Sequence, residues 1–209
     1  MALIRTERGL DRLVNFSDAA VAIAITLLIL PLVDAAGQIG HSSFGEFIDK
    51  NFWEIFAFVV SFAVIARFWV VHHRIFEGVR EYNAWMVWLN FLWLFAIAII
   101  PFTANVISVT AGQRPEVYAL YIGNMVLAML ATRLIAEVLY RNPELMTEQA
   151  RADIDRTRGL AELIIMAVAL VLAVLFPAIN LWWLFLLFLS GPVHAVLHRL
   201  VYGPSQKAA

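Results

Sequence analysis

Several polar and ionisable side chains interrupt the apolar segments of this sequence, and they are the residues that could do chemistry. The set is Asp18, Arg67, His72, His73, Asn90, Arg133, Glu137 and Glu162. Ionisable groups inside a membrane are costly, so they tend to mark either a function or a paired structural site. Carboxylates and histidines could relay protons, whereas opposite charges could pair and hold helices together. The number of residues that separates each of them from the basic residues at the helix ends places all of them in the cytoplasmic half of the bilayer. Their formal charges nearly cancel, as expected of mutually paired groups.

The spacing of these residues favours pairing over metal binding. Arg133 and Glu137 are four residues apart, so they share one face of a helix and are expected to form an ion pair. Arg67 and Glu162 are expected either to pair or to extend toward the membrane surface. His72 and His73 are adjacent, so on a helix they diverge by about 100° and do not easily face one ion. We therefore expect no metal site.

The first apolar segment carries a different pattern. Ile23, Leu27 and Leu30 follow the i, i+4, i+7 spacing of a single helix face, and Thr26 lies on its flank. Asp18 points about 140° away from Ile23 on the same helix. Such a helix could line a pore, or it could face lipid while a polar anchor holds it, and spacing alone does not choose between these.

Six helices must position these residues, because a spanning helix needs roughly 20 mostly apolar residues. The segments that meet this requirement lie at about 13–33, 52–74, 83–108, 117–140, 159–178 and 181–201. A tight hairpin at Pro177–Asn180 separates the last two, and Pro31 and Pro101 are placed where they could bend helix ends. We predict an all-α integral membrane protein in which residues 1–209 form one domain.

The composition supports a membrane protein. Hydrophobic residues make up 62% of the 209 and charged residues only 15%, against about 45–50% and 25% in soluble domains. Lipid must cover the excess. The net charge of −1 gives no reason to expect a nucleic-acid partner, and the absence of cysteine excludes disulfides, thiol catalysis and thiolate metal sites.

Basic residues predict the orientation. Eleven of the 15 Lys and Arg would lie on one side of the membrane and only Lys50 and Arg114 on the other, with two more inside helices. The basic side faces the cytoplasm, so both termini are expected there in a multi-pass protein of the cell membrane. A cleaved signal peptide is an alternative for the first segment, but Asp11 and Asp18 argue against it. The external linker at 34–51 is expected to hold a short amphipathic helix around Phe44–Ile48.

A family resemblance adds what the patterns leave open. The run Arg12-x-x-x-Phe16-Ser17-Asp18 resembles the signature of the transmembrane protein 175 family, which are potassium channels of bacteria and of eukaryotic lysosomes. Further matches follow in order: Trp69-x-x-His72-His73-Arg74-x-Phe76, Leu89-Asn90 and Pro101-Phe102, which would end the third helix. They cover roughly the first half of the chain. The later helices match only in number and hydrophobicity.

This resemblance implies a six-helix subunit with one copy of the signature and a homotetramer in which the first helix of each subunit lines a central pore. Ile23, Leu27 and Leu30 would form stacked apolar rings, with the Thr26 hydroxyl near the narrow part. An inter-helix network would hold that helix in place. Its members would be Arg12, Ser17, Asp18, Asn90 and one of His72 and His73. Trp69 would either join this network or face lipid, and Phe16 of the signature would serve packing.

No Thr-Val-Gly-Tyr-Gly filter of ordinary potassium channels occurs in the sequence. Selectivity would then arise from a narrow apolar constriction and its dehydration barrier, with modest preference for potassium over other monovalent cations. No cofactor is expected beyond the permeant potassium ions, and lipid is the remaining partner. Trp88 and Trp93 are expected to face lipid or pack in the core.

Two other functions remain open from the residues alone. A proton-coupled secondary transporter could use Asp18 with the His72/His73 cluster, although no internal repeat accompanies it. A membrane enzyme acting on lipid finds no nucleophile–base spacing and no His-Glu-x-x-His motif, so we do not expect an enzyme.

Overall fold

The protein is almost entirely helical in the computed structural model, which describes residues 3–4, 7–37, 40, 43–110, 114–152, 154–157 and 159–203. The long helices are α1 (Glu7–Leu27), α4 (Phe52–Glu77), α5 (Ala84–Val109), α6 (Pro115–Arg141) and α8 (Leu160–Leu175). The shorter elements are β1 (Leu3–Ile4), α2 (Leu30–Ala36), α3 (Phe44–Lys50), β2 (Tyr82–Asn83), η1 (Pro143–Leu145), α7 (Glu148–Ala152), η2 (Pro177–Leu189) and α9 (Ser190–Tyr202). Strands β1 and β2 pair in antiparallel orientation.

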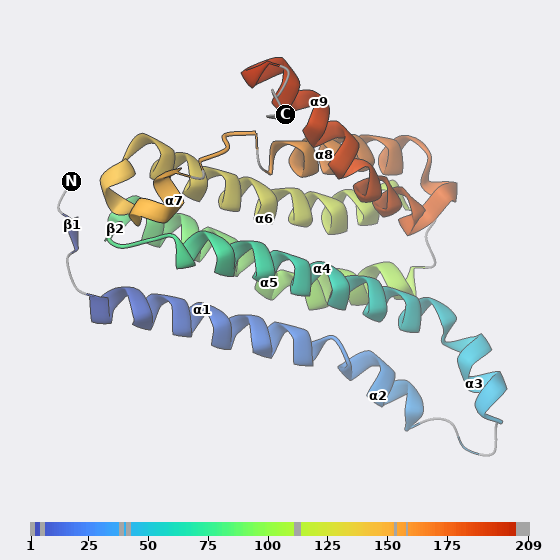
Figure 1. Cartoon of the computed structure of the whole chain (residues 1–209). Coiled ribbons are helices and arrows are strands. Elements are labelled where there is room, and N and C mark those ends of the chain that lie inside the picture. The colour runs from blue at the N-terminus through green and yellow to red at the C-terminus, as the bar shows by residue number, and fades with distance from the viewer. Residues whose placement is uncertain are drawn as a thin grey trace.

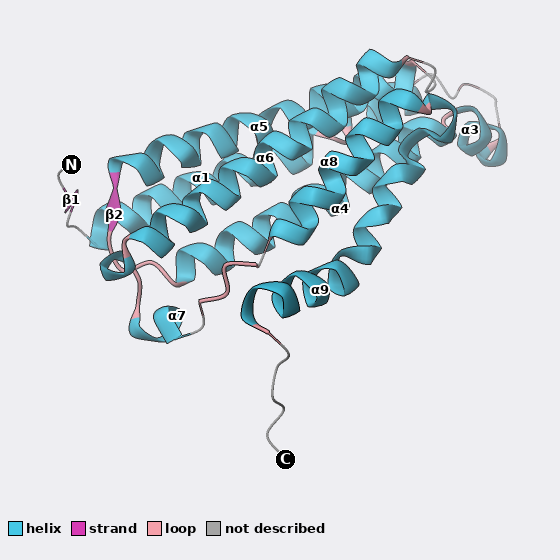
Figure 2. Ribbon diagram, turned by 90° about the horizontal axis from the view of Figure 1, so that it is seen from above, coloured by secondary structure: helices cyan, strands magenta, loops and turns pink. Residues whose placement is uncertain are grey.

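The long helices run side by side (Figures 1 and 2), with α5 in contact with α1, α4 and α6, and with α8 against α6. Helix α1 and the short α2 lie along one edge of this bundle, and α9 crosses the opposite side (Figure 1). Within the described ranges, five segments are long and apolar enough to span a membrane: Arg8–Ala36, Phe52–Glu77, Ala84–Val109, Pro115–Arg141 and Leu181–Tyr202. With the shorter apolar helix Leu160–Leu175, they confirm the predicted all-α membrane fold.

The first predicted helix, 13–33, is interrupted in the structure. Helix α1 ends at Leu27 and α2 begins at Leu30. The cause is Pro31, which has no N–H to donate to the Leu27 carbonyl and whose ring crowds that carbonyl. The backbone tightens instead, with the Leu28 N–H on the Ile25 carbonyl at 3.3 Å. The expected single helix was therefore wrong at this point, although both parts belong to one membrane-length segment.

Two other proline-related expectations also need correction. Helix α5 runs from Ala84 to Val109, close to the predicted 83–108, so Pro101 lies inside the helix and does not end it as the Pro101-Phe102 motif was expected to. The last predicted helix, 181–201, is α-helical only from Ser190, because residues Pro177–Leu189 form a 3₁₀ helix, much longer than the usual three or four residues. The predicted reversal before it is correct, since η2 packs back against α8.

The short helix expected around Phe44–Ile48 is present as α3. A capping box starts it: the Ser43 hydroxyl accepts from the Glu46 N–H, and the Glu46 carboxylate accepts from the Ser43 N–H. The capping box thereby gives hydrogen-bond acceptors to two backbone N–H groups that have no partner within the helix.

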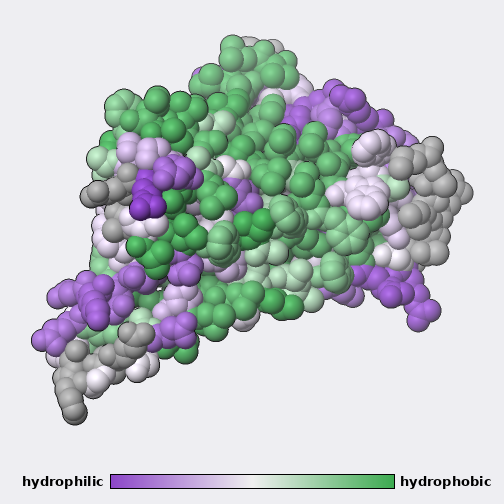
Figure 3. Space-filling view, turned by 180° about the vertical axis from the view of Figure 1, so that it is seen from behind, coloured by the Kyte–Doolittle hydropathy of each residue, from purple (hydrophilic) through white to green (hydrophobic). Residues whose placement is uncertain are grey.

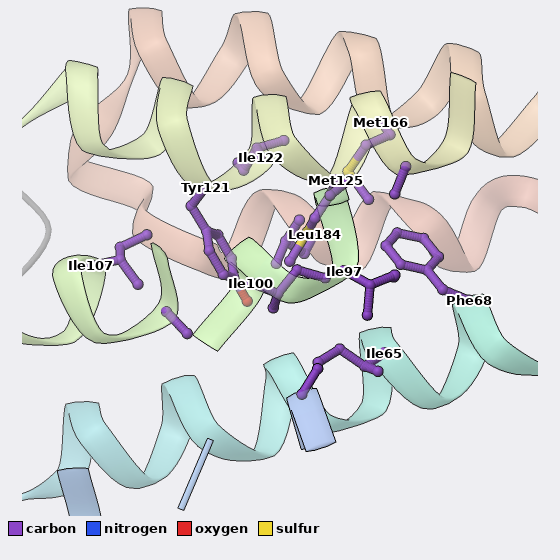
Figure 4. Packing of buried hydrophobic residues seen from close by; sticks show 14 of the residues in the cluster. Ile65, Phe68, Ile97, Ile100, Ile107, Tyr121, Ile122, Met125, Met166 and Leu184 are labelled. Carbon is purple, nitrogen blue, oxygen red and sulfur yellow. The ribbon is translucent and has the colours of Figure 1, made fainter. Parts of the chain in front are cut away.

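The core lies between the long helices. Ile65 and Phe68 of α4, Ile97 and Ile100 of α5 and Met125 of α6 meet there (Figure 4), and all are buried. Hydrophobic residues also cover most of the face opposite that of Figure 1, and hydrophilic residues gather mainly toward its two ends (Figure 3). An apolar band of this kind is what a lipid bilayer requires.

Candidate functional site

Helix α1 has two faces with different surroundings. Ser17, Val21, Ala24 and Leu28 recur at intervals of four, three and four residues and are buried against the bundle. On the other side, the side chains of the three aliphatic residues predicted for the constriction stay largely exposed in the single chain. The exposed fractions are 60% for Ile23, 43% for Leu27 and 49% for Leu30.

Three helices meet at Asn90, which α5 holds fully buried. The Asn90 amide N–H₂ donates to the Ser17 hydroxyl at 2.9 Å, and that hydroxyl donates to the Leu13 carbonyl at 2.9 Å. Because the amide nitrogen faces Ser17, the amide oxygen faces His72, where it lies 2.7 Å from Nε2. An oxygen acceptor requires the proton on Nε2. The chain of bonds therefore assigns the His72 tautomer and ties α4 through α5 to α1.

A second bond joins α1 directly to α4. The Trp69 indole N–H donates to the Asp18 carboxylate at 2.8 Å. The sequence left open whether Trp69 joins the polar residues or faces lipid, and in the structure it joins them. Asp18 and Ser17 are adjacent, so these two bonds hold neighbouring positions of α1 from two sides.

The ring of His72 is packed between aromatic residues. It stacks on Trp93 with 4.0 Å between ring centroids and on Phe76 with 4.4 Å. Of the two positions expected for these tryptophans, in the core or facing lipid, Trp93 takes the core and is fully buried, whereas Trp88 is exposed. Within the described residues, His72 Nδ1 and Trp93 Nε1 are buried without a hydrogen-bond partner. The aromatic packing of His72 was not predicted, because a tryptophan among apolar residues carries no signal of which side it faces.

Three of the predicted network residues lie elsewhere. His73 pairs with Glu77 at 3.3 Å and stacks on Trp69 with 5.2 Å between ring centroids. Phe16 is exposed and touches the edge of Phe91. Arg12 is exposed and has no hydrogen bond or ion pair with any residue that the structure describes. It precedes Asp18 by six residues, which separates them by about 9 Å along the helix and about 120° around it.

Thr26 does not bond outside its own helix. Its hydroxyl donates to the Ile23 carbonyl at 2.8 Å and is exposed. That bond closes the last turn of α1 before the interruption. Thr26 therefore sits beside the exposed apolar face of Ile23 and Leu27, as the spacing predicted.

The other intramembrane charges form two pairs. The Arg133–Glu137 pair was predicted, whereas pairing was one of two expectations for Arg67 and Glu162. Arg133 lies 3.2 Å from Glu137 on α6, and Arg67 of α4 lies 3.4 Å from Glu162 of α8. These four residues therefore stabilise the bundle away from α1. Over the described part of the chain, no three His, Cys, Asp or Glu residues are grouped so that they could hold a metal ion.

One polar cluster, which joins the connection before α8 to α9, escaped the sequence analysis. Asp155, in the connection before α8, accepts from the Thr157 hydroxyl at 2.6 Å and lies 3.1 Å from His194 of α9. Partial burial raises the pKa of Asp155, but the hydrogen bonds from Thr157 and His194 outweigh this and hold it below its ordinary value. The cluster fastens α9 to the rest of the chain.

Part of this chain is similar in sequence to a known family of proteins. Residues 12–101 match the family described as "Endosomal/lysosomal potassium channel TMEM175". A protein named as a potassium channel from Streptomyces collinus is 34% identical over 126 residues, which is 57% of this chain and 58% of the relative. Another from Chamaesiphon minutus is 37% identical over 100 residues, 44% of this chain and 45% of the relative. The matched part of this chain thus spans about half the length of each of these relatives.

The fold also has a match among solved structures. The crystal structure of a lysosomal potassium-selective channel TMEM175 homologue from Chamaesiphon minutus superimposes with a TM-score of 0.65 at 22% identity, over 93% of this chain and 96% of that one. This likeness establishes the fold, including the C-terminal helices that the family match does not reach.

Proposed function

We propose that this protein is a potassium-preferring cation channel of the cell membrane, because residues 12–101 match the TMEM175 family. It has no catalytic residue and no cofactor besides the permeant ions. The observation that carries the proposal is the exposed apolar face of α1 at Ile23 and Leu27, opposite a face fixed by hydrogen bonds to two other helices. Every residue of this arrangement lies inside the matched family segment.

The pore forms when four copies assemble around a central axis, with α1 of each copy lining it. In a single chain α1 lies at the edge of the bundle (Figure 1), which is the position a shared pore requires. Ile23, Leu27 and Leu30 then stack as apolar rings with the Thr26 hydroxyl beside them. Arg12 and Phe16, exposed in the single chain, contact a neighbouring copy in this assembly.

The constriction selects ions by dehydration. A ring of aliphatic side chains offers no ligand oxygen, so an ion must shed part of its hydration shell to pass, and potassium sheds water more easily than sodium. Such rings can also close by dewetting. We therefore propose modest potassium preference and some permeation by other monovalent cations.

The polar residues beside the pore are structural in this account. Ser17, Asp18, Trp69, His72 and Asn90 fix the rotation of α1, so that Ile23 faces the axis. A rotation error of one residue, about 100°, would turn Ile23 away from the pore. Both termini lie in the cytoplasm, and residues 1–209 form one membrane domain.

Ion flux from liposomes that contain the purified protein tests the proposal. A potassium gradient should drive electrogenic flux that exceeds the flux under an equal sodium gradient, without a proton gradient. Flux that requires a proton gradient would favour a secondary transporter that uses Asp18 and the His72/His73 cluster. Empty liposomes and liposomes with heat-unfolded protein control for leak.

A further inference from the structure

The interruption between α1 and α2 divides the proposed constriction into two parts. Ile23 and Leu27 belong to α1, whereas Leu30 belongs to α2. Within the described residues, the carbonyls of Leu27 and Leu28 accept no backbone hydrogen bond across the break. A helix bends where bonds of the i→i−4 ladder are missing, and proline is the usual cause.

The two parts are held very differently. α1 is anchored by the bonds of Ser17 and Asp18 and by the buried side chains of Val21 and Ala24. α2 buries none of its side chains, and no side chain caps its first turn. Local stability follows the number of buried contacts, so α2 can move at a lower free-energy cost than α1.

Space for such a movement exists behind α2. A cavity of about 690 Å³, open on one side, lies between α2, α3, α4 and α5. Leu30, Pro31 and Ala35 of α2 line one wall, so Leu30 lies at the border between the cavity and the exposed face, and Asn105 of α5 lines another wall. Charged residues of three helices, Asp34, Glu46 and Glu54, also line it, so water can fill the cavity and leave again as its walls approach one another.

We propose that α2 is a hinged outer gate: it turns about Leu28–Ile29 into this cavity and withdraws Leu30 from the ion path, while Ile23 stays fixed. The proposal rests on the proposed channel function, and it adds a moving element to it. Pro31 maintains the hinge, because it has no N–H with which the break could close into a continuous helix.

Disulfide trapping tests the hinge in the full-length protein. The chain has no cysteine, so any cross-link comes from the pair that is introduced. With Ala35→Cys and Asn105→Cys, a turn of α2 into the cavity brings together residues from opposite walls. We expect mild oxidation to cross-link this pair and to raise potassium flux from liposomes, and a reductant to reverse both. Each single-cysteine variant should show neither change.

A helix-closing variant separates hinge motion from simple proximity. Pro31→Ala restores an N–H that can donate to the Leu27 carbonyl, so cross-linking of the Ala35/Asn105 pair should slow severalfold. The matched control is Pro177→Ala, which changes the proline that begins η2, and it should leave the rate unchanged.

The outcomes are distinct. No cross-link, or a rate that Pro31→Ala leaves unchanged, would overturn the hinge even if the unmodified protein conducts potassium. A reversible cross-link that leaves the flux of a conducting protein unchanged would overturn the gating role. If no variant conducts, the channel proposal fails, while the cross-linking rates still decide whether α2 moves.

Discussion

Removing the side chain of Asn90 should destabilise the protein more than removal of a comparable buried asparagine elsewhere. Asn90 is fully buried and bonds both His72 and Ser17. In Asn90→Ala the His72 N–H loses its acceptor, and leaving a buried donor unpaired costs about 1–3 kcal/mol. Loss of the Ser17 bond adds about 0.6 kcal/mol, the average for a hydrogen bond between membrane helices. The free energy of unfolding should therefore fall by about 2–4 kcal/mol.

The assay is equilibrium unfolding in mixed micelles, followed by tryptophan fluorescence, with a double-mutant cycle that adds Ser17→Ala. Because Asn90 and Ser17 touch, the cycle should give a coupling energy of about 0.6 kcal/mol and at most about 1.7 kcal/mol.

Asn124→Ala is the matched control. Asn124 is also buried, but its amide donates to the Ala96 carbonyl at 2.8 Å and does not reach α1. Combined with Ser17→Ala it should be additive. Zero coupling between Asn90 and Ser17, or equal coupling in both cycles, would refute the argument that this chain of bonds docks α1.

Three further changes have expected outcomes of their own. Trp69→Phe keeps the aromatic ring but removes the bond to Asp18, so thermal unfolding in detergent should show a loss of up to about 3 kcal/mol, and an unchanged midpoint would exclude a docking role for that bond. The pKa of Asp155 is lowered by folding, so its contribution to stability is present above about pH 4 and is lost as the pH falls through the lowered pKa. Thermal midpoints between neutral and acidic pH should fall less steeply for Asp155→Asn than for the wild type, and parallel curves would contradict this. Tyr121→Phe removes the hydrogen-bond partner of the buried Ser61 hydroxyl, 2.7 Å away. The free energy of unfolding, measured by denaturant titration, should fall by about 1 kcal/mol. An equal loss in a Ser61→Ala background would show that the two hydroxyls are not coupled.

The sequence predicted the helical segments well because a membrane imposes a minimum apolar length on every span. It did not predict the 3₁₀ stretch Pro177–Leu189, where no residue pattern distinguishes a 3₁₀ from an α-helix. The break after Leu27 was foreseeable in part, since Pro31 has no N–H. Pro101 also lacks an N–H, yet it lies within the continuous helix α5. The presence of a proline alone therefore did not locate the interruption.

The candidate site was predicted by residue type and depth, but not by direction. In a soluble helix, apolar periodicity tells which side is buried. In a membrane span, both the lipid face and the core face are apolar, so that signal is lost. His72 lies on the same buried face of α4 as Ile65 and Phe68, whereas His73 lies one residue further round. Only the packing of α4 against α5 shows that His72, not His73, meets Asn90.

The central claim is that the exposed face of α1 lines the ion path, and ion selectivity in liposomes tests it most directly. Ile23 and Val171 are both exposed aliphatic residues of membrane helices, at 60% and 56%, but Val171 belongs to α8. Ile23→Ser should lower the potassium-to-sodium flux ratio toward one and raise the leak, while Val171→Ser keeps the wild-type ratio. Equal ratios in all three proteins would contradict the claim and move the pore to another helix.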